Sequence, residues 1–243
     1  MLYVYDGSEN GFLTAFLAAF SDPQAVLSSK NKQLLLGQTP VFIETDHARA
    51  KRALERLRTF DRETPRDLAW LLRSGEADNE QVAFEYLRFL VSEKRPVRNQ
   101  FAEACVFKAI EYLRKVGLEI HRFHGFIRFM ETASGALYAP FSPDNDICDL
   151  LLPHFRARLP AFPFVLHDIK RKKAAVYDGQ NAFVAPLEQA EILLSADETA
   201  WKTLWKRYYV AVNIPSRERL KQMRGYMPTR YWAQMPEKTE IFP

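Results

Sequence analysis

The chain has 243 residues, 47% of them hydrophobic, and a net charge of +4 at pH 7. This length allows one large domain or two small ones with an ordinary hydrophobic core. The longest apolar runs, residues 12–20 and 148–152, are much shorter than the roughly 20 residues that a membrane-spanning helix needs, and no basic-then-apolar leader precedes them. We therefore expect a cytoplasmic protein that does not associate with a membrane.

The two cysteines, Cys105 and Cys148, belong to no CxxC pair. Two thiols cannot build a disulfide framework or a four-thiolate zinc site, so we expect both to be core residues.

Charge is distributed unevenly along the chain. Residues 1–93 carry a net charge of −3, whereas residues 94–230 carry 22 Lys or Arg against 14 Asp or Glu, a net charge of +8. A surface that binds a polyanion leaves this asymmetry in a sequence, although ordinary surface charges can also produce it.

The first part of the chain predicts two strand–helix units. The β-prone segment Leu2–Tyr5 precedes a helical pattern that reaches Phe20, and the short strand Val41–Ile43 precedes a second amphipathic helix. Two more helices should begin with capping residues, one at Thr64 and one at Asp78, the latter paired with Gln81.

A break at residues 93–96 predicts the boundary between an N-terminal α/β part, residues 1–93, and a basic α+β part, residues 94–243, that pack as one unit. A long helix from about Gln100 to Val116 should follow the break and end at Gly117.

Beyond Gly117 the hydrophobic period changes to two. Two hairpins are predicted, around residues 133–135 and 171–172, with the helix 146–158 between them, which gives a ββαββ segment with an antiparallel sheet. A capping box at Ser195–Glu198 then predicts a C-terminal helix, and a shorter helix should run from Ser216 to Gly225. The expected fold class is α+β.

Several enzyme signatures are absent: there is no GxGxxG after a strand, phosphate loop, HExxH, GxSxG or three-cysteine radical-SAM motif. No cofactor of its own is therefore expected, and an enzymatic activity would depend on scattered residues.

The densest cluster of functional side chains runs from Glu119 to Phe129. Arg122 and Arg128 could contact phosphates or base edges, with Phe126 or Phe129 available for stacking. Alternatively, the aromatic rings belong to the core and the arginines extend from it to the surface.

An enzyme is the second hypothesis for the same region. Four residues are weak candidates for a catalytic acid, a base or a metal ligand: Glu119, His121, His154 and Asp168. Their spacing matches no known metal site, so no metal is assigned.

A second basic cluster lies at the predicted tip of the second hairpin and consists of Lys170, Arg171, Lys172 and Lys173. Arg156 and Arg158 end the preceding helix. We expect these six side chains to contact phosphates and position the backbone, without base recognition.

A third cluster alternates basic and aromatic residues between positions 217 and 232. The candidates in it are Arg224, Arg230, Tyr231 and Trp232. Arginine and aromatic side chains together suit single-stranded DNA or an extruded base. The alternative is that the aromatic rings cap the core.

Four segments of the chain, Leu2–Ser8, Val116–Phe129, Pro153–Arg158 and Met227–Trp232, resemble a bacterial family of DNA metabolism or repair proteins. In that family the protein is typically encoded beside a radical-SAM protein similar to spore photoproduct lyase, and a related domain occurs fused to uracil-DNA glycosylase-like domains. The family pattern has an Arg-x-Asn element where this chain reads Ile214–Arg219, so a contact made by that asparagine is in doubt here.

The resemblance and the basic clusters lead to one principal hypothesis and two rivals. The principal hypothesis is a DNA-binding accessory protein in DNA repair or modification that presents DNA to a radical-SAM partner. The rivals are a DNA-acting hydrolase, glycosylase-like or metal-dependent, and a protein–protein adaptor.

Overall fold

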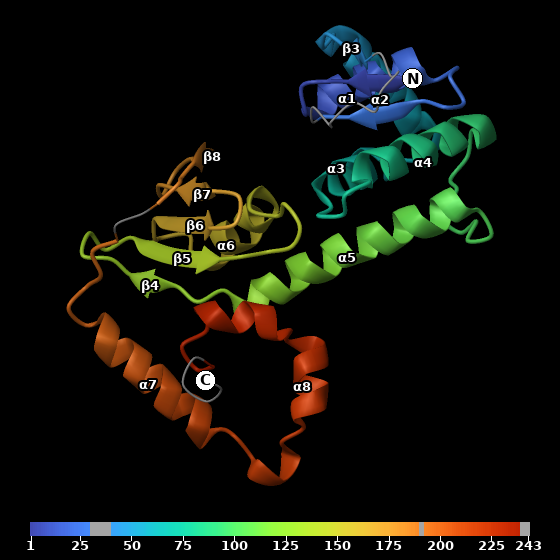
Figure 1. The fold of residues 1–243 in the computed structure, drawn as a ribbon. Coiled ribbons are helices and arrows are strands. Elements are labelled where there is room, and N and C mark those ends of the chain that lie inside the picture. The colour runs from blue at the N-terminus through green and yellow to red at the C-terminus, as the bar shows by residue number, and fades with distance from the viewer. Residues whose placement is uncertain (30–39, 190–191, 239–243) are drawn as a thin grey trace. The chain divides into compact units, whose positions relative to one another are not determined.

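The computed structural model describes residues 1–29, 40–189 and 192–238, and its fold is α+β, as expected (Figure 1). The chain divides into two compact units, Met1–Gly117 and Leu118–Pro243. This division lies within a long helix, whereas the boundary expected near residue 93 lies inside the first unit. No helix in the described part of the chain is both long and apolar enough to cross a bilayer.

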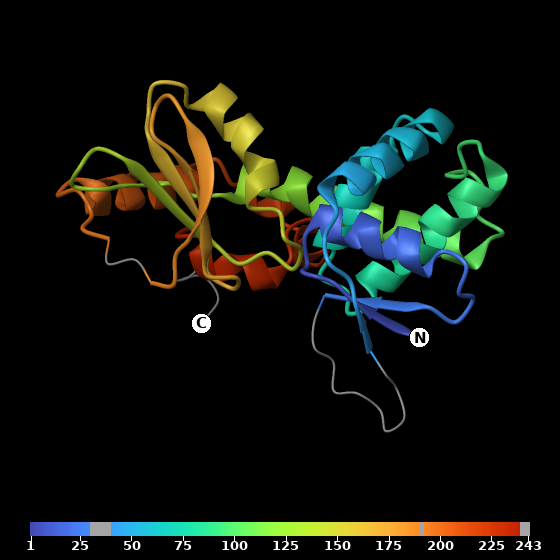
Figure 2. The ribbon, with the colours of Figure 1, turned by 90° about the horizontal axis from the view of Figure 1, so that it is seen from above.

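The first unit is built on a short parallel sheet. Its strands are β1 (Leu2–Val4), β2 (Val26–Ser28) and β3 (Pro40–Phe42), in the order β2-β1-β3. The sequence did not predict β2, because three residues are too few to show a period of two. Figure 2 shows helices gathered beside these strands.

The first helix, α1 (Glu9–Ala19), follows β1 directly. The Ser8 side chain accepts a hydrogen bond from the Gly11 N–H and so caps the start of the helix.

Three more helices complete the α-helical layer: α2 (His47–Phe60), α3 (Thr64–Arg73) and α4 (Asn79–Glu93). Asp78 occupies the N-cap position of α4 as predicted, but neither Asp78 nor Thr64 makes the expected capping bond. Thr64 is the first residue inside α3, and Asp78 makes no cap bond because it accepts hydrogen bonds from Lys108 and Tyr112. Gln81 bonds the backbone of Ala25 and Leu27 beside β2.

The long helix α5 (Ala104–Phe126) continues past the stop predicted at Gly117. A Cβ atom at Gly117 would lie 2.9 Å from Cζ3 of Trp70, so this glycine permits close packing and does not end the helix. The cluster from Glu119 to Phe126 is therefore helical, whereas the sequence predicted that the hydrophobic period changes to two beyond Gly117.

The second unit contains a five-stranded sheet in the order β4-β5-β6-β7-β8. Its strands are β4 (Met130–Glu131), β5 (Leu137–Phe141), β6 (Phe164–Asp168), β7 (Lys173–Tyr177) and β8 (Ala182–Pro186). Both predicted hairpins are present, since β4 pairs with β5 and β6 with β7 in antiparallel fashion. Strand β8 was not predicted.

The expectation of a purely antiparallel sheet was wrong, because β5 and β6 are parallel. Their connection passes through η1 (Asp149–Leu151) and α6 (Leu152–Arg158), and a crossover of this kind returns the chain in its original direction. Phe155 of α6 packs edge-on against Phe129 and Phe164, with ring centroids 5.2 and 6.4 Å away. Phe129 is therefore a packing residue.

Four helical segments end the described chain: α7 (Glu198–Ala211), η2 (Pro215–Arg217), α8 (Leu220–Tyr226) and η3 (Thr229–Gln234). The capping box expected at residues 195–198 was wrong. Asp197 occupies the cap position without a side-chain bond, and the Glu198 carboxylate instead accepts the Glu131 N–H at 2.9 Å.

Candidate nucleic-acid interface

Glu119 lies at the centre of a buried polar network. Its carboxylate is 2% exposed and accepts four hydrogen bonds. The Asp144 N–H and the Tyr231 hydroxyl donate to Oε1 at 2.9 and 2.7 Å. The backbone and side-chain amides of Asn145 donate to Oε2 at 2.8 and 2.6 Å. Because all four donors are internal, the geometry gives Glu119 a structural role, holding α5, the 144–145 loop and η3 together.

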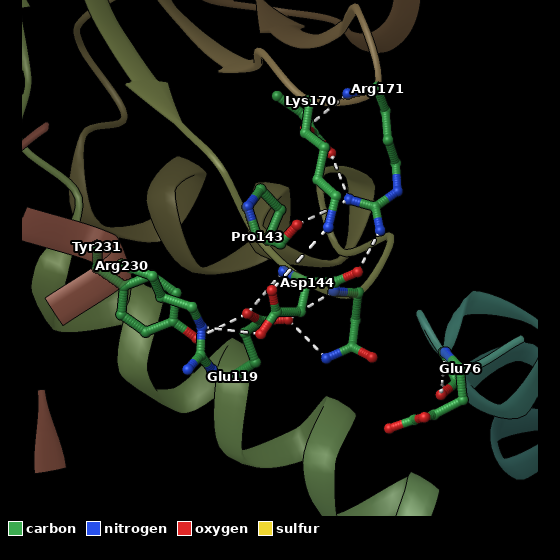
Figure 3. A network of polar contacts seen from close by, with 11 residues as sticks. Glu76, Glu119, Pro143, Asp144, Lys170, Arg171, Arg230 and Tyr231 are labelled. Atoms are coloured by element: carbon green, nitrogen blue, oxygen red, sulfur yellow. Dashed lines mark hydrogen bonds and ion pairs between the residues drawn. The ribbon is translucent and has the colours of Figure 1, made fainter. Parts of the chain in front are cut away.

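A second layer of this network consists of charged side chains around Asp144 (Figure 3). The Arg230 guanidinium lies 2.8 Å from Oδ2 of Asp144, and Lys170 lies 4.0 Å from Oδ1. Arg171 donates to the Pro143 carbonyl at 3.1 Å, to the Asp144 carbonyl and to the buried Asp168 carboxylate at 3.1 Å. Arg171 therefore anchors the hairpin to the loop and is not available as a free phosphate contact.

Tyr231 and Trp232 are both buried. Burial, followed by the hydrogen bond to Glu119, raises the pKa of the Tyr231 hydroxyl above its ordinary value, so this group stays protonated and donates. The Trp232 indole N–H donates to the Met227 carbonyl at 3.1 Å. These contacts favour the alternative in which both rings cap the core, and neither ring is placed to stack on a base.

Arg128 is held in an internal ion pair with Glu237. Its Nε and Nη2 donate to Oε1 of Glu237 at 3.0 and 2.6 Å, and its guanidinium lies 5.2 Å from the Trp205 ring centroid. Burial raises the pKa of Glu237, but the hydrogen bonds and charge of Arg128, together with the bonds from the backbone and Trp205, outweigh this effect, and the pKa lies below its ordinary value. Arg122 is less constrained, since it donates one bond, at 3.1 Å, to the Gly225 carbonyl.

The histidines near the proposed catalytic residues differ in their surroundings. His124 and His154 stack with ring centroids 3.9 Å apart, whereas His121 is exposed. His167 lies 2.6 Å from the Tyr138 hydroxyl and 3.1 Å from the Leu187 carbonyl. Across residues 1–29, 40–189 and 192–238, no three His, Cys, Asp or Glu side chains are grouped to hold a metal.

The hairpin tip, Lys170–Lys173, is partly neutralised by nearby carboxylates. Arg171 pairs with Asp168, and Lys173 pairs with Asp146. Lys170 and Lys172 are exposed, and Lys172 has a positive φ of 52° at the turn. Arg156 and Arg158 on α6 are also exposed, and the Arg156 guanidinium lies 5.3 Å from the Tyr177 ring centroid. The tip therefore offers fewer free cations than its sequence indicates.

Most of the basic excess lies on the α7–α8 segment, residues 199–230. It contains eight Lys or Arg and one Glu, a net charge of +7, whereas residues 94–198 have a net charge of +1. Arg224, one of the predicted contacts, is exposed on α8. The segment also exposes four large aromatic side chains: Trp201, Trp205, Tyr208 and Tyr226. Exposed cations interleaved with exposed aromatic rings are typical of surfaces that bind single-stranded nucleic acid.

The sequence reasoning missed the α7 part of this surface. Trp201, Leu204 and Tyr208 recur at helical spacing, and the sequence predicted a helix here without assigning it a function. Counting charge over residues 199–230 alone, apart from the rest of the basic half, would have shown where the excess lies.

Comparison with protein families shows to which family the chain belongs. Residues 77–237 match a family model described as a domain of unknown function, DUF4130. The chain belongs to this family. The matched region of the DUF4130 domain begins at the start of α4 and includes the Glu119 network, the hairpin tip and the α7–α8 segment. No curated protein and no solved structure matches the chain significantly.

Proposed function

We propose that this protein binds DNA as an accessory factor in repair or modification and presents it to a radical-SAM partner enzyme. The observation that carries the proposal is the exposed surface of residues 199–230, with a net charge of +7 and four exposed aromatic side chains. Cations on such a surface bind phosphates and release counterions, which supplies affinity without sequence recognition.

The radical-SAM partner rests on the family resemblance. In the relatives that the four motif segments resemble, the neighbouring protein is similar to spore photoproduct lyase and would supply the redox chemistry. In this arrangement the chain binds DNA and the partner supplies the chemistry. This agrees with the state of the chain's own candidate acids, because Glu119 accepts four internal hydrogen bonds and Asp168 accepts one from the Arg171 side chain.

A hydrolase has less support, because two of its candidate residues, Glu119 and Asp168, are buried and held by internal hydrogen bonds. The adaptor is the second candidate, and one observation favours it: α7 exposes a continuous apolar stripe, which also suits a protein partner. The two functions are compatible, since an accessory protein must contact both DNA and enzyme.

Fluorescence anisotropy with labelled oligonucleotides tests DNA binding. We expect affinity for DNA to fall steeply as salt rises, because phosphate neutralisation dominates. Replacing Lys221 and Arg224 on α8 with Gln should weaken binding. Replacing Lys51 and Arg52, two exposed cations on α2, with Gln removes the same charge elsewhere and should change binding less. Affinity independent of salt, or equal loss in both double variants, would contradict the proposal.

Sedimentation of the protein with a radical-SAM protein similar to spore photoproduct lyase tests the partnership. A complex that forms with both proteins, and that retains a labelled oligonucleotide, is the expected result. If the two proteins sediment separately with and without DNA, the radical-SAM part of the proposal fails.

A further inference from the structure

The outer face of α7, formed by Trp201, Leu204 and Tyr208, is not covered by any other described part of the chain. These side chains are 56%, 57% and 56% exposed, respectively. Their spacing of three and four residues places them in one row along the helix. Tyr226 on α8 is 71% exposed and is a fourth large exposed side chain in the α7–α8 segment.

Other contacts of α7 hold this face in place. The Trp205 indole N–H donates to Oε2 of Glu237 at 3.0 Å, and Tyr209 accepts a hydrogen bond from Lys238. The Lys238 ammonium also lies 3.3 Å from the Met223 sulfur of α8. The same short stretch, Glu237–Lys238, therefore fixes both helices, and the exposed rings sit on anchored elements.

Free cations accompany the exposed rings. The five are Arg207, Arg217, Arg219, Lys221 and Arg224, all exposed. None of the five side chains makes an ion pair or hydrogen bond with another residue in the described ranges. The only acidic residue between positions 199 and 230 is Glu218. The ligand that complements this surface must carry repeated negative charge together with flat apolar faces.

We propose that the α7–α8 segment is a binding site for single-stranded DNA, with bases stacked on Trp201, Tyr208 and Tyr226 and phosphates contacted by the five cations. This inference rests on the proposed function and adds the strand type and the contacting residues. In a duplex the base faces are already stacked and only the phosphates and the base edges in the grooves are accessible, so exposed rings contribute little. A single strand presents both groups at once.

Charge complementarity distinguishes this occupant from a protein. A protein partner would need an acidic surface interleaved with apolar pockets to match five free cations and the outer face of α7. Single-stranded DNA has that alternation at every nucleotide.

Titration with a labelled oligo(dT) strand and a duplex of the same length tests the strand preference. We expect tighter binding to the single strand. If all five cations contact phosphates, the slope of log K against log salt for the single strand should be about −3.5, and it should change to about −2 in the Lys221→Gln/Arg224→Gln variant.

Aromatic variants separate stacking from charge. Trp201→Ala combined with Tyr208→Ala should weaken single-strand binding at least about tenfold with an unchanged salt slope, because stacking releases no counterions. Tyr226→Ala should also weaken it, by a smaller factor. Phe183→Ala on β8 is the control, because Phe183 is a comparably exposed ring, at 50%, outside the segment. Trp201→Phe should keep most of the affinity while removing one fluorophore that the bound strand quenches.

Each outcome has one meaning once circular dichroism shows that the variants are folded. Normal single-strand binding by the aromatic variants, with weakened binding by the Lys221/Arg224 variant, would overturn stacking and leave DNA binding standing. If the aromatic variants bind single-stranded DNA normally but no longer bind the radical-SAM partner, the outer face of α7 is a protein-docking face, and the inference is also overturned. If the parent protein binds neither DNA form at low salt, the proposed function itself fails.

Discussion

The Tyr231 hydroxyl donates a hydrogen bond to Oε1 of Glu119 at 2.7 Å, although 112 residues separate the two in sequence. This bond joins η3 to α5 and completes a carboxylate that is otherwise satisfied by the Asp144 and Asn145 amides. Glu119 and Tyr231 lie in two of the segments that carry the family resemblance. Part of that resemblance therefore reflects residues that stabilise the fold.

Tyr231→Phe should lower the free energy of unfolding by about 1–3 kcal/mol, because a buried carboxylate oxygen loses one of its two donors while packing is unchanged. Urea unfolding monitored by circular dichroism measures this. Tyr226→Phe is the control, since Tyr226 is exposed, and it should change stability by less than about 0.5 kcal/mol. Equal stability of the two variants would contradict the assigned role of Tyr231.

Arg128→Ala should destabilise the protein by about 3–5 kcal/mol, because it leaves the buried Glu237 carboxylate without its cation. Arg128 is itself only 23% exposed and Glu237 is 2% exposed. Arg122→Ala removes one hydrogen bond at a partly exposed position and should cost less than about 1 kcal/mol.

Thermal unfolding of both arginine variants, with DNA affinity measured on the same samples, checks this ordering. Adding Glu237→Gln to Arg128→Ala should recover part of the stability, because the remaining buried group is then neutral. A stable Arg128→Ala variant that binds DNA weakly would instead make Arg128 a DNA contact.

Two glycines of α5 should respond in opposite ways to Ala. Gly125 has no atom within 4 Å of an added Cβ, so Gly125→Ala should stabilise the protein by about 0.5–1 kcal/mol through helix propensity. Gly117→Ala places a methyl group 2.9 Å from Trp70 and should destabilise it by about 1 kcal/mol, the overpacking cost exceeding the same propensity gain. The urea midpoints of the two variants measure both effects. If both substitutions stabilise the protein, the Trp70 ring moves aside freely and the packing role of Gly117 is contradicted.

The stacked pair of His124 and His154 should make stability depend on pH. Burial, followed by the charges of His154 and His121, lowers the pKa of His124 below 6.5. The unfolded chain takes up the proton first, so the stability present above pH 6.5 is lost as pH falls through the folded pKa.

Urea midpoints measured between pH 7.5 and 5 should therefore decrease toward the acid end. His124→Gln has no imidazole to titrate at this position and should show a shallower decrease over the same interval. A parent protein and variant with parallel pH profiles would rule out His124 as the cause.

The sequence alone determined the features that depend on local pattern. Hydrophobic periodicity predicted α1, α2 and both hairpins, because a helix or a paired strand repeats its buried positions every 3.6 or two residues. The capping residue Ser8 was also predictable, since its partner Gly11 is three residues away. The location of the basic excess in the second half of the chain follows from counting.

Only the tertiary structure decided what the individual polar residues do. The sequence allowed Glu119 to be a catalytic acid, a metal ligand or a structural residue, and its hydrogen bonds with Tyr231 and Asn145 show the structural role. Arg128 was a candidate phosphate contact, but it pairs with Glu237, which is 109 residues away in the sequence. Gly117 has the sequence character of a helix stop, yet the ring of Trp70 gives it a packing role. A hydrogen bond or a close approach between distant residues leaves no periodic trace in the sequence, because it depends on how the elements fold together and not on the pattern within any one of them.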